Sequence, residues 1–207
     1  MKKKIIISAV NIYYGGTLSI VKDALQWLSA NATEEYEVIA LVHKKELYPF
    51  ENITYIEFPD SRSSWFKRLN YEYVYFKKLS NQLKPYLWFS LHDITPIVNA
   101  DVKAVYCHNA SPTYKISLKE ALQDKVFAAF TLLYKYLYRI NIKSNTYIIV
   151  QQDWIREFFK KSFGLPHSKM VVAYPDVELA TAEPVAAHTA GASTVFFYPS
   201  FPRVFKN

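Results

Sequence analysis

Cysteine is almost absent from the sequence: Cys107 is the single one among 207 residues. One thiol can form neither an internal disulfide nor a thiolate metal cluster, so the sequence predicts a reducing, cytoplasmic compartment. Long apolar runs are missing as well. The longest, Val126 to Tyr134, has nine residues, whereas a helix that crosses a bilayer needs roughly 18 or more. The stretch from Ile5 to Val10 after the basic start is too short for the core of a secretory signal.

Several nucleotide and metal signatures are also absent. The chain has no dinucleotide fingerprint of three spaced glycines and no phosphate loop ending in Gly-Lys-Ser/Thr. It has no His-Glu-x-x-His pattern and no cysteine pair, so a metal site built from His92, Asp93 and His108 is not expected. No nucleic-acid-binding module is recognisable either.

The remaining composition is that of a globular protein with an uneven charge. Hydrophobic residues make up 51% of the chain and charged residues 21%, which excludes a disordered or collagen-like protein. The net charge is +7, and residues 61–165 carry 16 basic and 7 acidic side chains. This asymmetry favours an anionic partner, whether nucleic acid, anionic lipid or a phosphorylated small molecule, without choosing among them.

Strand-like and helix-like segments alternate along the chain. Several strand-like runs are continuously apolar, as is typical of strands covered on both faces. Between the first two strands, apolar residues repeat at helical spacing: Leu18, Val21, Leu25 and Leu28. The order predicts an α/β fold with a Rossmann-like, doubly wound parallel sheet. The predicted strands are Lys4–Val10, Tyr36–Val42, Ile53–Phe58, Tyr86–Leu91, Ala104–Cys107, Tyr147–Val150 and Val171–Ala173.

The composition changes near residue 176. Residues 1–176 form the predicted Rossmann-like domain, and residues 177–193, with six alanines and with Thr181, Pro184, Thr189 and Gly191, read as a linker. Residues 194–207 open with the apolar run Val195 to Tyr198, which we interpret as the first strand of a further domain that the sequence does not include.

Candidate site residues follow three of the predicted strands. Gly15 and Gly16 lie between the first strand and the first helix, where exposed amides, with Thr17 or Ser19 as a cap, can hold an anion. A plain strand-to-helix turn is the competing interpretation. His92 and His108 each follow a later strand, and because parallel strands end at one edge of a sheet, the two imidazoles are expected to share a crevice with the glycine pair. Simple capping of strand ends is the alternative for both.

The segment from Trp65 to Lys78 mixes aromatic and basic side chains. Such a pattern suits an interfacial helix among lipid headgroups or a surface on which nucleic-acid bases stack. A core helix with a solvated basic face accounts for it equally well. A fourth segment, at the end of the chain, places Arg203 and Lys206 three residues apart after a predicted strand.

In their order, these segments resemble the amino-terminal half of glycosyltransferase family 4, retaining enzymes of the GT-B fold. The resemblance covers nearly the whole chain and depends on motifs that are individually weak. They are Tyr14-Gly15-Gly16-Thr17-Leu18, Cys107-His108-Asn109, Val150-Gln151-Gln152-Asp153-Trp154, Phe163-Gly164-Leu165, the run from Val171 to Pro175, and the stretch from Phe197 to Asn207.

The resemblance implies roles for individual residues. His108 would contact the transferred sugar, and Gly15 and Gly16 would form the loop near the donor phosphates and the acceptor. Arg203 and Lys206 would neutralise the departing diphosphate. The other substrate-binding residues that we predict are Thr17, His92, Asn109 and Gln151, and neither a cofactor nor a metal is implied.

The implied function is the acceptor-binding domain of a retaining transferase that moves a sugar from a nucleotide sugar to a hydroxyl, in surface glycan synthesis. The expected partners are the nucleotide sugar, a glycan or lipid-linked acceptor, a carboxyl-terminal domain and the inner face of the membrane. This chain alone is expected to be inactive. Two alternatives stay open: a noncatalytic Rossmann-like module for a phosphorylated ligand or an anionic membrane, and an epimerase-like or different GT-B nucleotide-sugar enzyme.

Overall fold

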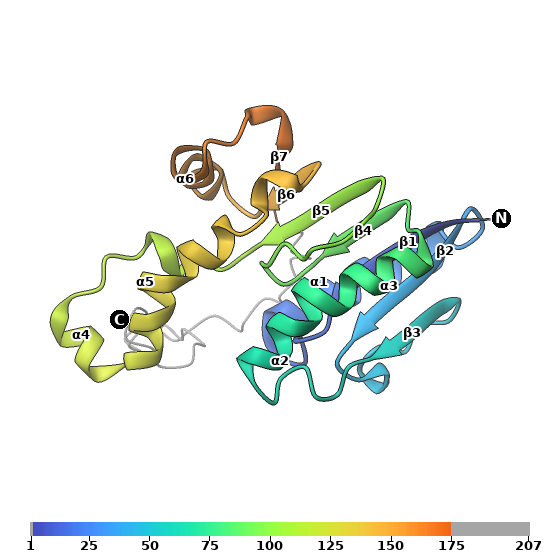
Figure 1. Cartoon of the computed structure of the whole chain (residues 1–207), viewed down its shortest axis with the longest axis horizontal. Helices are drawn as coiled ribbons and strands as arrows, with labels where there is room; N and C mark the ends of the chain where they lie inside the picture. The colour runs from blue at the N-terminus through green and yellow to red at the C-terminus, as the bar shows by residue number, and fades with distance from the viewer. Residues whose placement is uncertain (1, 175–207) are drawn as a thin grey trace, which may run out of the picture.

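A single parallel sheet of seven strands organises the protein in a computed structural model that describes residues 2–174 (Figure 1). The strand order is β3-β2-β1-β4-β5-β6-β7, so the predicted doubly wound, Rossmann-like topology is confirmed. Each strand lies within two residues of its predicted limits. The strands are β1 Lys3–Ala9, β2 Tyr36–Val42, β3 Ile53–Glu57, β4 Leu87–Ser90, β5 Val102–Cys107, β6 Tyr147–Val150 and β7 Met170–Val172.

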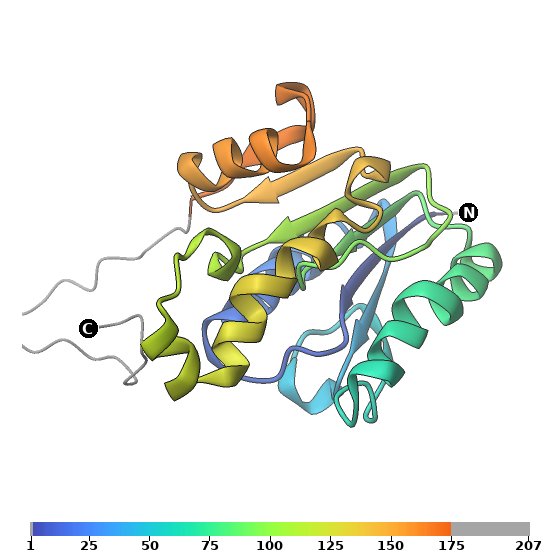
Figure 2. The same ribbon diagram turned by 60° about the vertical axis from the view of Figure 1, so that its left-hand side comes forward.

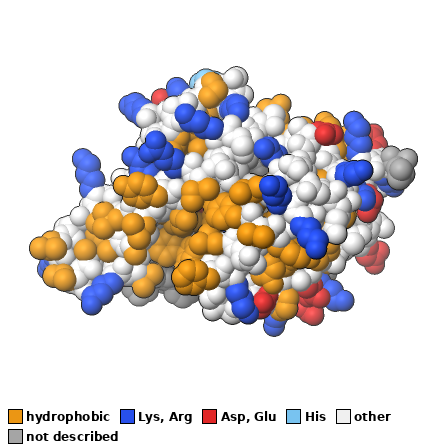
Figure 3. All heavy atoms as spheres, in the orientation of Figure 1, with side chains coloured by type: hydrophobic (Ala, Val, Ile, Leu, Met, Phe, Trp, Pro, Cys, Tyr) orange, Lys and Arg blue, Asp and Glu red, His pale blue; other side chains and the backbone are white. Residues whose placement is uncertain are grey.

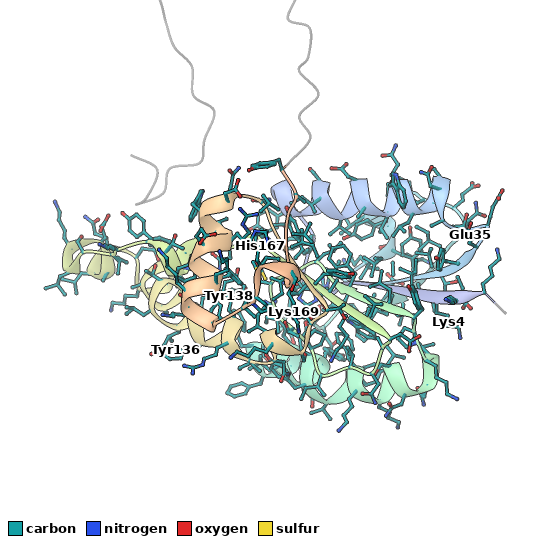
Figure 4. The ribbon with its side chains drawn as sticks, turned by 90° about the horizontal axis from the view of Figure 1, so that it is seen from above. Lys4, Glu35, Tyr136, Tyr138, His167 and Lys169 are labelled. Atoms are coloured by element: carbon teal, nitrogen blue, oxygen red, sulfur yellow. The ribbon has the colours of Figure 1, made fainter. Side chains whose placement is uncertain are left out.

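Helices cover both faces of the sheet (Figure 2). The helices are α1 Gly15–Asn31, α2 Trp65–Asn70, α3 Phe76–Leu83, α4 Leu118–Gln123, α5 Lys125–Arg139 and α6 Asp153–Phe163, with short 3-10 turns between them. Figure 4 shows α1 and α3 on opposite sides of the strands. The predicted linker, the boundary at residue 176 and the strand after residue 193 lie outside the described residues.

The alternation of side chains along β1 explains the two layers. Ile5 and Ile7 pack with Val21 and Leu25 of α1, whereas Ile6 packs on the other face, in the cluster that contains Phe76 of α3. Successive strand residues point to opposite faces, so a strand without polar alternation needs a cover on both sides. The continuous apolar run of β1 therefore dictates a sheet between two helical layers.

The third core cluster joins α5 and α6 to the second half of the sheet. Tyr138 of α5 is buried, and its ring lies 4.9 Å from that of Phe159 in α6. Tyr136, two residues earlier, is 64% exposed and points outward from the same helix (Figure 4). Helix α5 is therefore apolar on two sides, only one of which is used by the core.

The aromatic and basic segment from Trp65 onward forms one continuous helical rod. Helices α2 and α3 are joined by a π-helical turn, Tyr71–Tyr75, and Ser64 caps the start by accepting a hydrogen bond from the Lys67 amide. Phe76 is buried against the sheet, while Phe66 is 87% exposed. The rod thus contributes to the core, as one interpretation of its sequence required, and still presents aromatic side chains to solvent near its beginning.

Candidate functional site

The carboxyl ends of β1, β4 and β5 meet at the point where the strand order reverses. Strands β1 and β4 are neighbours in the sheet, although their chain connections run to opposite sides, and such a switch point is the usual ligand-binding crevice of an open α/β sheet. A small cavity of about 80 Å³ lies there. Its lining residues are Asn11, Ile12, Tyr13, Tyr14, Thr17, His92, Asp93 and His108.

Asp93 organises this edge of the sheet, and the sequence analysis missed it as a site residue. Its buried carboxylate accepts hydrogen bonds from the amides of His108 (2.8 Å) and Asn109 (3.1 Å). The hydroxyls of Tyr138 (2.8 Å) and Tyr134 (3.2 Å), both on α5, donate to it as well. Asp93 has a positive φ of 71°, a left-handed conformation that aspartate tolerates better than most residues. One carboxylate thus fixes the loop after β5 to the loop after β4.

His108 lines the cavity, as the sequence predicted, and its side chain is 20% exposed. Its Nε2 lies 3.4 Å from Oδ2 of Asp93. Since a carboxylate only accepts hydrogen bonds, this neighbour favours a proton on Nε2 in the neutral ring and leaves Nδ1 as an acceptor. That Nδ1 is buried and has no hydrogen-bond partner within residues 2–174. Asp93 thereby orients the His108 imidazole at the wall of the cavity and leaves its acceptor nitrogen unpaired among the described residues.

His92 lines the cavity from its buried side. The side chain is 1% exposed, and its Nε2 lies 3.1 Å from the Ser8 hydroxyl and 3.3 Å from a carboxylate oxygen of Glu72. Arg68 donates a hydrogen bond of 3.1 Å to the His92 carbonyl. Burial, followed by the charge of Arg68, holds the pKa of His92 well below its usual range. The shared edge predicted for the two histidines is confirmed, but His92 supports the site from inside the core.

Glu72, at the π-helical turn, is a buried acid that lies beside the His92 ring. It is fully buried, and neither of its carboxylate oxygens has a hydrogen-bond partner among the described residues. Burial raises its pKa from 4.5 to about 8, although Arg68 opposes the shift. A buried carboxyl that cannot be solvated is more stable protonated, so Glu72 is mainly neutral at pH 7.

We predict that Glu72→Gln stabilises the domain increasingly as pH rises. Because the pKa of Glu72 is higher in the folded state than in the unfolded state, its contribution to the free energy of unfolding is complete below the unfolded pKa and is lost as pH approaches 8. Glutamine mimics the neutral form of the side chain and does not lose this contribution. Between pH 5 and 6.5 the difference in unfolding free energy between the variant and the unmodified protein should grow by about 2 kcal/mol. Urea unfolding at several pH values measures it.

Glu157→Gln is the control of opposite sign. A hydrogen bond from Lys160 lowers the pKa of the Glu157 carboxyl. The contribution of Glu157 to the free energy of unfolding is therefore present above the unfolded pKa and is lost as pH falls. A pH-independent effect of Glu72→Gln would contradict a buried, ionisable Glu72.

The glycine pair is at the cavity edge and opens α1. Gly15 has a φ of 71°, where a side chain would be strained. The expected cap by Thr17 or Ser19 is wrong: the cap residue is Tyr14, no side chain caps the helix, and the Thr17 hydroxyl donates back to the Tyr14 carbonyl. Because α1 already begins at Gly15, Thr17 is the third residue of the helix and does not occupy the position from which a side chain caps it.

The other predicted residues fall in different places. Asn109 follows His108, and its side chain accepts hydrogen bonds from the Ser111 amide and hydroxyl. Gln151, after β6, hydrogen-bonds the Tyr106 side chain. Cys107 is fully buried, and burial raises the pKa of its thiol well above 9, as is typical of an unreactive, structural cysteine. Arg203 and Lys206 lie outside the described residues.

Sequence analysis also missed residues that the loop after β1, the loop after β3 and α2 bring to this edge. Asn11 lines the cavity, and its Oδ1 is buried with no partner in the described part of the chain. The Arg62 guanidinium lies 3.3 Å from the centre of the Tyr13 ring. Arg68 and Arg62 line the adjoining hollow of about 360 Å³. Of Asn11, Arg62 and Arg68, only Arg68 lies in the basic, aromatic segment from Trp65 to Lys78 that the sequence analysis singled out.

Two negative findings concern residues 2–174 alone. No group of three or more His, Cys, Asp or Glu side chains there is arranged to hold a metal ion. None of the helices in that range has the length and apolar character required to traverse a bilayer.

Comparison with known proteins gives a match in structure only. No family model matches the chain, and no curated protein matches its sequence. Among solved structures, the apo form of the lipopolysaccharide outer core galactosyltransferase WaaB is similar with a TM-score of 0.52 at 12% identity. The match covers 86% of this chain and 47% of that one, so the chain spans about half the length of the neighbour. The protein thus has the α/β, Rossmann-like fold found in half of a GT-B glycosyltransferase.

Proposed function

We propose that this chain is the acceptor-binding domain of a retaining glycosyltransferase of family 4, acting in surface glycan synthesis. The observation that supports it best is the cavity at the switch point of a sheet whose fold matches half of a galactosyltransferase. In such a transferase a bond forms between an acceptor oxygen and the anomeric carbon of the donor sugar. The bond from that carbon to the diphosphate breaks, the hydroxyl loses its proton, and a nucleoside diphosphate departs.

The residues of the cavity have complementary tasks in this proposal. His108, oriented by Asp93, accepts a hydrogen bond from a hydroxyl of the transferred sugar, and the amides around Gly15 and Gly16 face the donor phosphates. Asn109, Gln151 and Thr17 complete the substrate contacts, while Arg203 and Lys206 balance the departing diphosphate. Charge stabilisation by fixed cations and amides makes a metal unnecessary. His92 acts from below, by holding the loop after β4.

The missing partner in this proposal is a nucleotide-sugar-binding domain in the same polypeptide. The single cysteine supports a cytoplasmic setting, with peripheral contact at the inner face of the membrane.

The chain alone is expected to bind nucleotide sugars with at best millimolar affinity, because most nucleotide contacts would come from the other domain. Isothermal titration calorimetry with a panel of uridine, guanosine and adenosine diphosphate sugars tests this. Micromolar binding would mean that the donor site lies in this domain.

Transfer itself is tested on a polypeptide in which this chain is joined to the nucleotide-sugar-binding domain that we propose. Release of nucleoside diphosphate that depends on an added acceptor supports the proposal. Failure to transfer any sugar to lipid-linked or glycan acceptors would favour the noncatalytic module.

A further inference from the structure

An apolar groove of about 460 Å³ runs between α2 and α5. Its lining includes Trp65, Phe130, Leu133, Tyr136, Leu137 and Ile140. Four of them are large side chains left substantially exposed, from 41% for Ile140 to 64% for Tyr136. Contiguous apolar surface of this kind on a folded domain marks a binding site more often than it marks chance exposure.

The groove continues into the candidate site through shared residues. Trp65 and Phe130, whose rings lie 6.2 Å apart, line both the groove and the hollow that holds Arg62 and Arg68. Asn11, Tyr13 and Tyr14 line both that hollow and the cavity beside His108. The surface therefore changes in order from apolar, to cationic, to polar.

The positive charge of the hollow that holds Arg62 and Arg68 suits a phosphate group. Arg68 is 8% exposed, and its Nε is buried without a hydrogen-bond partner in the described range. Arg62 is exposed beside it, and no Asp or Glu is among the described residues that line either the groove or the hollow. Figure 3 shows the hydrophobic side chains gathered over this part of the face with Lys and Arg around them, while acidic side chains lie mainly at the opposite end.

We propose that the acceptor is a lipid-linked phosphate: its hydrocarbon chain lies in the α2–α5 groove, its phosphate binds between Arg62 and Arg68, and its hydroxyl-bearing head reaches the cavity at His108. This inference rests on the proposed function and narrows the acceptor to an amphiphile. Neither a soluble glycan nor a bare anion has an apolar part that could fill the α2–α5 groove.

Binding of dodecyl phosphate to the chain, below its micelle concentration, tests the proposal by calorimetry. We expect it to bind at least about tenfold more tightly than dodecyltrimethylammonium, which has the same tail and the opposite charge. Inorganic phosphate alone should bind more weakly still. Equal affinity for the two amphiphiles would overturn the phosphate assignment.

Two neighbouring leucines on α5 allow a matched test of where the hydrocarbon chain of dodecyl phosphate binds. Leu133 lines the groove and is 59% exposed, while its neighbour Leu132 is 62% exposed and does not line it. Leu133→Ser should weaken dodecyl phosphate binding roughly five- to tenfold, because apolar contact is lost, and Leu132→Ser should leave it unchanged. Equal effects would overturn the groove and indicate non-specific adsorption of the alkyl chain to exposed apolar side chains.

Arg62→Gln tests the phosphate position, because the exposed Arg62 can be changed without opening the core, as a change at Arg68 would. Dodecyl phosphate binding should fall about tenfold, with no change for dodecyltrimethylammonium. Failure of this inference differs from failure of the proposed function. A protein that transfers sugar to a soluble glycan but ignores dodecyl phosphate overturns only the lipid acceptor, whereas one that binds it without transferring any sugar overturns only the transferase.

Discussion

Replacing Asp93 by alanine should destabilise the domain by about 3–5 kcal/mol, the cost of removing one partner from a buried charged hydrogen-bond cluster. Four donors converge on this carboxylate: the amides of His108 and Asn109 and the hydroxyls of Tyr134 and Tyr138. Burial, with the Asp93 charge, raises the pKa of both tyrosines well above 10, so they remain donors across the accessible pH range. Alanine removes the shared acceptor of all four, although the Tyr138 hydroxyl keeps the Asn109 carbonyl at 3.0 Å as a second acceptor. Denaturant unfolding measures the loss.

Asp93→Asn is the matched control. Asparagine has nearly the same shape, tolerates the left-handed backbone at this position, and keeps one carbonyl oxygen as an acceptor. It should therefore lose clearly less stability than alanine. If alanine cost under about 1 kcal/mol, Asp93 would not be the hub of this edge.

Replacing His108 by alanine in the longer transferase that we propose should lower kcat by on the order of 10²-fold, the size expected for one preorganised hydrogen-bonding group. The side chain is partly exposed in the cavity, and its Nδ1 makes no hydrogen bond within the described structure. The fold should therefore be little affected. Turnover and thermal midpoint must be measured on the same preparation.

His92→Ala should have the opposite effect, a loss of thermal stability with a smaller change in kcat. Its buried ring contacts Ser8 and Glu72, so alanine should lower the thermal midpoint, through a cavity and an unpaired Ser8 hydroxyl, while kcat changes less. Near-normal kcat in the His108 variant would place the sugar pocket elsewhere.

Local pattern was sufficient for the strands and for the edge at which they end. An apolar run such as Ile5–Ile7 in β1 must be covered on both faces, and parallel strands must end together, so the positions of Gly15, His92 and His108 after three strand ends at one edge could be predicted. How deeply each side chain is buried at this edge could not be predicted. His92 and His108 follow neighbouring strands in similar polar contexts, yet one is 1% exposed and the other 20%.

By itself, the sequence determined the parallel α/β fold and the edge that carries the site, because both depend on periodicity and chain order. Only the tertiary structure decided the Asp93 cluster, the buried Glu72 and the α2–α5 groove. Tyr138 is 45 residues from Asp93, and Trp65 and Phe130 come from separate helices. Which polar atoms lose water, and which apolar faces remain open, depends on the packing of segments far apart in the chain, and no local pattern encodes that.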